Sequence, residues 1–560
     1  MKTTLFACAL VLLSVTCAAK PQIDASVYDS WPSVDGAQIS EDGSYASYVG
    51  RAGSSPAKLV IVSTDARWRM ELPAASAADF VCELRSACRF MVVRELQGAL
   101  SVVQLGSSSV ARLGAVETYK VSAQGGSPWL AYQPRSESQQ LRLVNLNTQQ
   151  ERRFEKVVEY AFGTDGRSLL ITTAAESQAL QWLDLDTGKA TTIWQGRGVS
   201  GAVFDDSGKR LAFVVNSADA GSAARSFWYY VAGTARARMV ADGRSPTLSA
   251  GLRLNGIREF SKDGRHLLID LQRNVPTLEP SADAVDVDVW SYRDERLQSQ
   301  QLADLAAGRT DRNYAALLDL ESRHIVQLEH NNELIRERAF NTRLGEVALL
   351  DRRSGSADRS EHHWSSAGKL STELLLFRNG RRIPVSTWDA ADESRPQLSP
   401  GGRFVVYFDP AKQVFLSLDT ASGIVREISR GIDTNWQRVD AQWLPLSWSR
   451  LRGVAGWLQG DAAVLIYDRY DVWQIDLSGK AAPINVTNGY GNRTQTIFSL
   501  RSDVMPHERV FARNERLILP AFDRATKHSG FFTQRLGQVA DPQRLSMGPY
   551  AYYLPTHERG

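Results

Sequence analysis

The sequence has few cysteines and no long apolar segment after its N-terminal region. Only four of the 560 residues are cysteine. No later apolar run approaches the roughly 18 residues of a membrane-spanning helix, so we expect no transmembrane segment in the mature chain. Charge of one sign is also scarce, because 65 Lys and Arg face 62 Asp and Glu, for a formal net charge of +3. This balance argues against a nucleic-acid-binding surface.

The sequence contains no Gly-x-Ser-x-Gly motif, in which a strained strand-to-helix turn exposes a nucleophilic serine. Two segments come near it, Gly166–Leu170 and Gly106–Val110, and both lack the final glycine. No βαβ pattern is present to hold such a turn. We therefore predict no catalytic residue and no hydrolysis by this chain alone.

Metal and cofactor sites are also missing from the pattern of residues. The eight histidines are scattered except for His362 and His363, which as strand neighbours would point to opposite faces. Asp468, Asp471 and Asp476 are conceivable cation ligands, but acids in a strand-turn segment more often accept backbone hydrogen bonds or pair with a neighbouring arginine. We predict no metal ligand and no cofactor.

The first 19 residues are typical of a signal peptide. Lys2 precedes the apolar run Leu5–Val15, and small residues follow through position 19. Cleavage before Cys17 with lipidation is an alternative, although Thr16 is larger than the residue that normally precedes such a cysteine. We predict a signal peptide at 1–19 and an exported chain, periplasmic or secreted.

Two cysteines remain in the mature chain, and both lie between apolar segments that predict a hairpin. Cys82 follows Phe80–Val81, and Cys88 precedes Phe90–Val93. Exported proteins meet an oxidising compartment, so we predict a Cys82–Cys88 disulfide, with two free thiols as the alternative. Closing so short a loop stabilises by about 2 kcal/mol in the chain-entropy model.

One pattern recurs along the chain: an apolar residue, a turn rich in Ser, Asp and Gly, and then an alternating apolar strand. The clearest copies are Ile39–Tyr48, Phe162–Ile171, Phe204–Phe213, Phe260–Ile269 and Leu398–Tyr407. With weaker copies, successive turns at positions 43, 87, 126, 166 and 208 lie 39–44 residues apart. This period is typical of β-propeller blades, whereas a β-sandwich would not repeat so evenly.

We therefore predict an all-β fold, a β-propeller over residues 20–560 with seven or eight blades of four-stranded antiparallel sheets. The spacing loosens between Gly264 and Gly402, which predicts irregular insertions around 279–394. Within that stretch, Ala315–Leu320 and Glu346–Leu350 fit either strands or short helical turns.

The repeats resemble the propeller repeats of the prolyl oligopeptidase family of serine peptidases and of the periplasmic protein TolB. More specific stretches look like the N-terminal regions of large exported bacterial members of that family. These stretches are Val285–Tyr292 with Leu297–Gln301, Tyr467–Trp473 with Ile484–Gly491, and Arg544–Tyr550.

The resemblance implies a propeller that precedes an α/β-hydrolase domain and restricts which peptides enter. The 560 residues show no such domain, so we expect a non-catalytic propeller part that binds or gates peptides, with a hydrolase domain or chain as partner. The alternative is a stand-alone periplasmic propeller that binds proteins, peptides or glycans. A propeller enzyme with a central metal would need several inward ligands that the sequence does not show.

Overall fold

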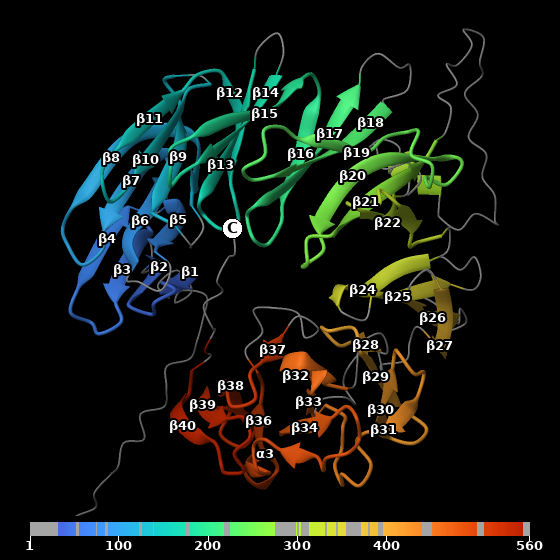
Figure 1. The fold of residues 1–560 in the computed structure, drawn as a ribbon. Helices are drawn as coiled ribbons and strands as arrows, with labels where there is room; N and C mark the ends of the chain where they lie inside the picture. The colour runs from blue at the N-terminus through green and yellow to red at the C-terminus, as the bar shows by residue number, and fades with distance from the viewer. Residues whose placement is uncertain are drawn as a thin grey trace, which may run out of the picture. The chain divides into compact units, whose positions relative to one another are not determined.

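The computed structural model describes residues 32–51, 55–73, 75–83, 88–122, 126–137, 139–174, 178–217, 224–274, 298–299, 302–303, 313–330, 333–342, 345–353, 371–378, 381–389, 396–438, 451–500, 509–550 and 552. The described fold consists of β-strands, together with very little helix (Figure 1). The chain divides into two compact units, one of Met1–Phe80 with Ala87–Ala115 and the other of Val81–Ser86 with Val116–Gly560. Each unit is described by itself.

The first unit carries two antiparallel sheets. Sheet I consists of β1 (Ser33–Ile39), β2 (Tyr45–Arg51), β3 (Lys58–Ser63) and β4 (Arg69–Pro73). Sheet II consists of β5 (Ala75–Cys82), β6 (Cys88–Glu95), β7 (Ala99–Gln104) and the first half of β8 (Val110–Val121). The second half of β8 pairs with β9, so this one long strand serves two successive sheets.

The second unit continues the series with sheets III to VI. Sheet III has the second half of β8, β9 (Trp129–Pro134), β10 (Leu141–Asn145) and β11 (Glu151–Phe154). Sheet IV has β12 (Val157–Phe162), β13 (Ser168–Thr173), β14 (Gln178–Asp184) and β15 (Ala190–Gly196). Sheet V has β16 (Val199–Phe204), β17 (Arg210–Ser217), β18 (Ala224–Val231) and β19 (Arg238–Ala241). Sheet VI has β20 (Leu252–Phe260), β21 (His266–Arg273), β22 (Asn313–Asp319) and β23 (Ile325–Gln327).

Four further sheets complete the second unit. Sheet VII has β24 (Glu333–Thr342), β25 (Gly345–Arg353), β26 (Ser371–Arg378) and β27 (Arg381–Asp389). Sheet VIII has β28 (Gln397–Leu398), β29 (Phe404–Asp409), β30 (Val414–Asp419) and β31 (Val425–Glu427). Sheet IX has β32 (Val454–Leu458), the 3-10 turn η3 (Gln459–Asp461), β33 (Ala463–Tyr467), β34 (Val472–Asp476), β35 (Ile484–Asn485) and β37 (Val510–Phe511). Sheet X has β36 (Thr496–Phe498), β38 (Arg516–Asp523), β39 (Ser529–Arg535) and β40 (Gln543–Gly548), with helix α3 (Tyr490–Thr494) before it.

The hydrophobic core of the second unit lies between consecutive sheets. One cluster joins sheets IV and V through Trp182 and Phe213, and another joins sheets V and VI through Phe227 and Leu267. Equivalent clusters lie between III and IV, VI and VII, VII and VIII, VIII and IX, and IX and X. Because alternate residues of a strand face opposite sides, the central strands must be apolar on both faces to pack between two neighbours.

Sheet succession and packing together make this an all-β chain with a β-propeller fold, as the repeats predict. The turn glycines that define the repeat have φ values of +66° to +72°, which glycine adopts readily. The second unit holds eight successive sheets in its described residues, seven with four strands and sheet IX with β37 as a fifth, and the first unit holds two more, where seven or eight blades in all are predicted.

The two ambiguous segments of the loosely spaced region are strands. Ala315–Leu320 overlaps β22, and Glu346–Leu350 lies within β25 of sheet VII. The predicted signal peptide, Val285–Tyr292 and the His362–His363 pair lie outside the described residues. The predicted boundary of a single propeller at 20–560 stays a prediction.

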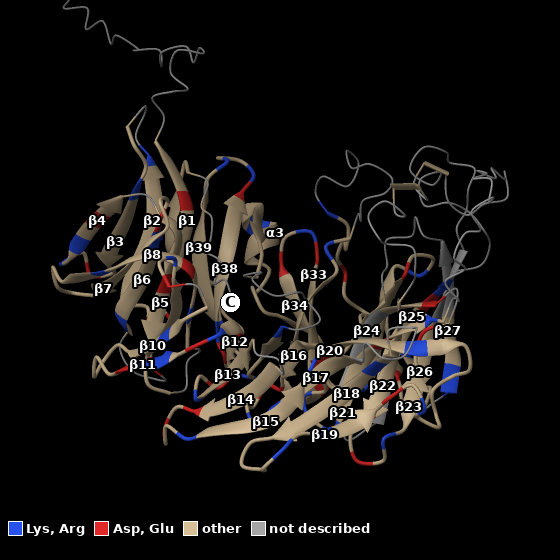
Figure 2. Cartoon of the chain, turned by 90° about the horizontal axis from the view of Figure 1, so that it is seen from above, with Lys and Arg blue, Asp and Glu red and all other residues tan. Residues whose placement is uncertain are grey.

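Charged residues of both signs are interspersed over the described sheets, mostly at strand ends and turns (Figure 2). No helix in the described ranges is long and apolar enough to cross a bilayer. The distribution agrees with the small formal net charge of the sequence.

Candidate functional site

The cysteines and the serine that the sequence analysis singles out have structural roles or are buried. Cys82 and Cys88 are both disulfide-bonded, which confirms the predicted disulfide. Ser168, in the nearest approach to a nucleophile motif, is 3% exposed within β13, so a substrate does not reach it. Within the described ranges, no group of three or more His, Cys, Asp or Glu is arranged to hold a metal ion.

Asp468 organises the turn between β33 and β34. One carboxylate oxygen accepts the backbone N–H groups of Tyr470 at 2.8 Å and Asp471 at 2.6 Å. The other oxygen accepts the Thr434 hydroxyl and the Trp473 indole N–H, both at 2.8 Å. With both oxygens occupied and 3% of the residue exposed, Asp468 is a turn-forming acid, as the sequence pattern favours.

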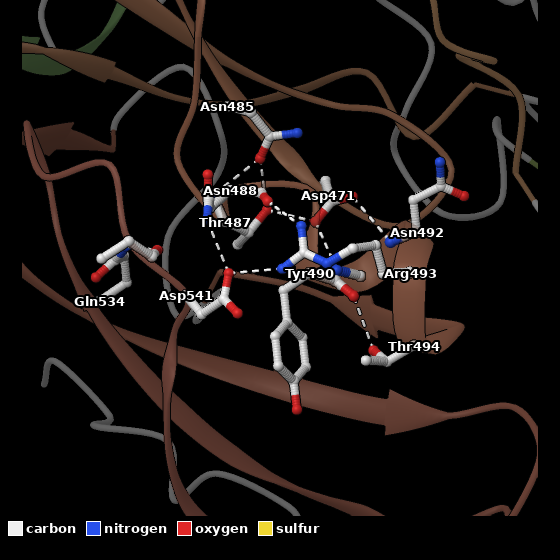
Figure 3. Close-up of polar contacts among 12 residues, drawn as sticks. Asp471, Asn485, Thr487, Asn488, Tyr490, Asn492, Arg493, Thr494, Gln534 and Asp541 are labelled. Atoms are coloured by element: carbon white, nitrogen blue, oxygen red, sulfur yellow. Dashed lines mark hydrogen bonds and ion pairs between the residues drawn. The ribbon is translucent and has the colours of Figure 1, made fainter.

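Asp471 caps the short helix α3 from outside the helix. Its Oδ1 accepts the Thr487 hydroxyl at 2.6 Å and the Gly491 N–H at 2.8 Å, and its Oδ2 accepts the Asn492 N–H at 3.0 Å (Figure 3). Burial raises the pKa of Asp471, while the hydrogen bonds from Thr487 and Asn492 act in the opposite direction. The carboxylate satisfies helix N–H groups that α3 itself leaves without partners.

Gly491 makes this approach possible. A Cβ at this position would lie 2.7 Å from the Thr496 carbonyl oxygen, 2.8 Å from Asp471 Oδ1 and 2.9 Å from the Tyr470 carbonyl oxygen. The Gly-Tyr-Gly run of the resembling stretch therefore serves close packing. Tyr490 between the two glycines packs against Phe498 and Phe532, with ring centroids 5.9 and 5.6 Å apart.

Exposed polar residues surround α3 and tie it to sheet X. Arg493 bonds the Asn488 carbonyl at 2.6 Å and Asp541 at 2.7 Å, and the Asn488 amide donates to the same Asp541 oxygen at 2.8 Å (Figure 3). The Arg524 guanidinium reaches the Tyr470 hydroxyl at 2.9 Å. The segment around α3 thus links sheets IX and X. Both carboxylate oxygens of Asp468 and of Asp471 accept hydrogen bonds within this link.

A second group of contacts involves the first strand of each sheet, which in most of the described sheets pairs with a strand on one side only. Lys120 Nζ donates to the Tyr160 carbonyl of β12 at 2.9 Å, and Gln133 Nε2 donates to the Val157 carbonyl at 2.9 Å. In the first unit, Gln38 donates in the same way to Ala78 of β5 at 3.1 Å. Side chains of one sheet therefore cover the main chain of the next.

The same covering recurs at later sheets. Arg225 Nη1 bonds the Asn255 carbonyl of β20, and Arg452 Nη2 bonds the Phe498 carbonyl of β36 at 2.6 Å. Unsatisfied main-chain groups at a strand edge attract other strands, so these long polar side chains protect the edges.

In sheet IX, the edge of the first strand, β32, is paired with the main chain of another segment, β37. β37 pairs in parallel with β32, with Val510 opposite Trp457 and Phe511 opposite Leu458. The Trp457 N–H donates to the Arg509 carbonyl at 2.8 Å. A Cβ on Gly456 would lie 2.7 Å from the Phe511 ring, so glycine admits this close approach. The first strand of a sheet in this molecule thus binds an extended segment.

The middle of β16, the first strand of sheet V, is open. Ser200, Gly201 and Ala202 are exposed, and a β-bulge interrupts the pairing with β17 between Ser200 and Val203. Gln178 Oε1 accepts the Gly198 and Val199 N–H groups at 2.9 and 3.2 Å, which covers only the beginning of the strand. In the described part of the chain, no side chain of another sheet bonds the main chain of residues 200–202.

Sequence reasoning missed these edge contacts, although a signal for one of them exists. Gln38 and Ala78 are 40 residues apart, as are Lys120 and Tyr160, which is one repeat period. A polar side chain that recurs at the same point of consecutive repeats is the pattern that predicts such a contact. The sequence carries no comparable signal for the open edge of β16. A strand edge that no side chain covers leaves no pattern of residues to recognise.

No family model matches the sequence, and no curated protein matches it. Among solved structures, tricorn protease matches with a TM-score of 0.30 and 10% identity over 91% of this chain, which spans 61% of that chain. Acylaminoacyl peptidase matches at 0.26 and 14% identity, with 68% of this chain and 50% of that chain covered. The β-propeller domain of the Trilobed protease from Pyrococcus furiosus matches at 0.24 and 10% identity, with 84% and 98% covered. Similarities this low establish neither a family nor an activity.

Proposed function

We propose that this chain is the non-catalytic propeller part of an exported serine peptidase of the prolyl oligopeptidase type, and that it binds peptides and limits which of them reach the hydrolase. The observation that carries the proposal is the pairing of β37 with β32, where the first strand of a sheet holds an extended segment through its main chain. Main-chain pairing of this kind accepts peptides of varied sequence.

Two further features support a binding role without catalysis. The sequence has no Gly-x-Ser-x-Gly motif, and Asp468 and Asp471 of the polar cluster around α3 accept turn and helix N–H groups. Acyl transfer by the route of this family needs a serine, a base and an oxyanion hole held together. The resemblance of the repeats, of Tyr467–Trp473 and of Ile484–Gly491 supports the peptidase type, and the N-terminal pattern supports export.

The test uses residues 20–560, a fluorophosphonate probe and fluorescein-labelled peptides. We expect peptide binding by fluorescence anisotropy and no covalent labelling of any serine. Stoichiometric labelling that one serine substitution abolishes would show a catalytic protein. Failure to bind any peptide, together with binding of a glycan or a folded protein, would favour the stand-alone binding propeller. Mass spectrometry of the exported chain should find its first residue between positions 18 and 20.

A further inference from the structure

We propose that the open edge of β16 at Ser200–Ala202 binds an extended peptide that carries a carboxylate, with Arg225 as the residue that recognises the charge. The proposal deepens the proposed function, on which it rests, because it names the site and the class of peptide. Three sets of contacts support it.

The first is the open main chain of the strand. Residues 200–202 are exposed, and the edge positions of β12, β20 and β36 are covered by Lys120, Arg225 and Arg452. The side chains of Ser200, Gly201 and Ala202 are small, so a peptide backbone can approach to hydrogen-bonding distance. An exposed edge offers N–H and C=O groups that pair with an added strand.

The second is the pairing of β37 with β32, which shows an extended segment bound to the first strand of another sheet. β37 lies in parallel on β32, and the Trp457 N–H to Arg509 carbonyl bond of 2.8 Å holds it there. β16 and β32 hold the same position in their sheets, each being the first strand and each carrying a bulge. An extended peptide on β16 would reproduce this arrangement between molecules.

The third is Arg225 of β18, which has no acidic partner in the described part of the chain and is linked to Ser200 of β16 through Asn216 of β17. Arg225 Nε donates to Asn216 Oδ1 at 3.1 Å, and its Nη1 donates to the carbonyl and amide oxygens of Asn255. The Asn216 amide in turn donates to the Ser200 hydroxyl at 3.2 Å. These acceptors are all neutral, so among the described residues no carboxylate neutralises the guanidinium, which is linked to Ser200 through Asn216. A carboxylate on the bound peptide would supply that charge, and arginine binds carboxylates well.

The experiment compares two labelled, end-blocked peptides, Thr-Val-Glu-Val-Thr and Thr-Val-Gln-Val-Thr, on residues 20–560. We expect the glutamate peptide to bind about tenfold more tightly, which corresponds to one charge-assisted hydrogen bond. Hydrogen exchange read by mass spectrometry should show that the peptide slows exchange of the 199–204 amides.

Arg225→Gln should abolish the preference for the glutamate peptide and leave the glutamine peptide bound within about twofold, since the main-chain pairing stays. The matched control is Arg236→Gln, because Arg236 is an exposed arginine between β18 and β19 of the same sheet. An equal loss in the control would assign the preference to general charge and overturn the proposal. Protection confined to another segment, β32 included, would overturn the site while the proposed function stands. Absence of binding by either peptide would also overturn the site, whereas the function is tested by the wider peptide set.

Discussion

The repeat turns of sheets VI and VIII have the same backbone hydrogen bonds, but the carboxylate that accepts the turn serine hydroxyl differs in origin. In sheet VI, Ser261 Oγ donates to Asp263 at 2.6 Å and accepts the His266 N–H at 2.9 Å. In sheet VIII, Ser399 Oγ accepts the Phe404 N–H at 2.9 Å, but it donates to Asp461 of η3 at 2.6 Å. The first turn is complete within six residues, and the second needs the following sheet.

The reason for the difference is a glycine. Gly401 stands where the sheet VI turn has Asp263, and a Cβ on Gly401 would lie 2.6 Å from Asp461 Oδ2. Asp461 fills that space, accepts the Gly401 N–H at 2.9 Å and the Arg403 N–H at 3.2 Å, and has a positive φ of 53°. In sheet VIII the acid of the turn therefore comes from sheet IX, so the turn is a contact between the two sheets. The positive φ of Asp461 is a strained backbone conformation.

Removal of Asp461 should have the largest effect. Asp461→Ala leaves the buried Ser399 hydroxyl and two partly buried N–H groups without an acceptor and should lower the free energy of unfolding by about 3 kcal/mol. Asp263→Ala, in the exposed local turn, should lower it by about 1 kcal/mol. Urea denaturation followed by tryptophan fluorescence measures both, and equal losses would contradict the distinction between the two turns.

Restoring the local acid provides a sharper comparison. Gly401→Asp alone should destabilise by about 2 kcal/mol, because the new side chain meets Asp461. In the Asp461→Ala background the same substitution should stabilise, since it supplies the acid as Asp263 does in sheet VI. A double-mutant cycle measures this change of sign. Additive effects would show that the two acids do not occupy the same place.

Two turn glycines provide a matched comparison with a smaller expected loss of stability. Gly208 and Gly423 both have positive φ, 66° and 73°. A Cβ on Gly208 would lie 2.5 Å from the Asp165 carboxyl carbon of the preceding sheet, whereas a Cβ on Gly423 meets nothing within 4 Å. Gly423→Ala should therefore destabilise by about 1 kcal/mol from backbone strain alone, and Gly208→Ala by roughly 2 kcal/mol because contact is added. Thermal unfolding of the two variants tests the order.

The smallest effects should appear in the dependence on pH. Asp476 accepts hydrogen bonds from Ser478, Lys480 and Ala481 in its own turn, and these bonds outweigh burial and lower its pKa. Its contribution to stability is present above the ordinary aspartate pKa of about 3.9 and is lost as the pH falls through the lowered value. The stability difference between wild type and Asp476→Asn should therefore grow as the pH rises from 3 to 6.

Asp471 should behave in the opposite sense. Burial raises its pKa, so the folded state binds the proton more tightly and loses stability as the pH rises from the ordinary value through the raised one. The difference between wild type and Asp471→Asn should shrink over the same pH range. Denaturation curves at several pH values compare the two acids, and parallel trends would refute the distinction.

The sequence predicts what is local and repeats. Ser, Asp and Gly in one turn predict the hairpin because each acts on a backbone group a few residues away, and the strands at Phe260–Ile269 and Leu398–Tyr407 follow. Asp461 escapes the pattern because its partners lie 58–62 residues earlier. The absence of an acid at Gly401 was the signal that a distant residue completes the turn.

The binding positions are harder to predict for a related reason. Whether β16 is open depends on which side chains of the neighbouring sheet reach it, and Gln178 reaches Val199 but not Ser200. Arg225 looks like any surface arginine in the sequence, and only the neutral partners Asn216 and Asn255 distinguish it. Such properties arise from packing between sheets, which no short motif encodes.

The link to Asp461 also sets an order of events during synthesis. Ser261–His266 can close its turn as soon as its own residues are available, whereas Gly401 must wait for an acid 60 residues later. At 5–20 residues per second this wait is roughly 3–12 s. During that interval the turn of sheet VIII lacks its acid, so this turn would stay open to proteases and to mispairing while residues 402–461 are being made.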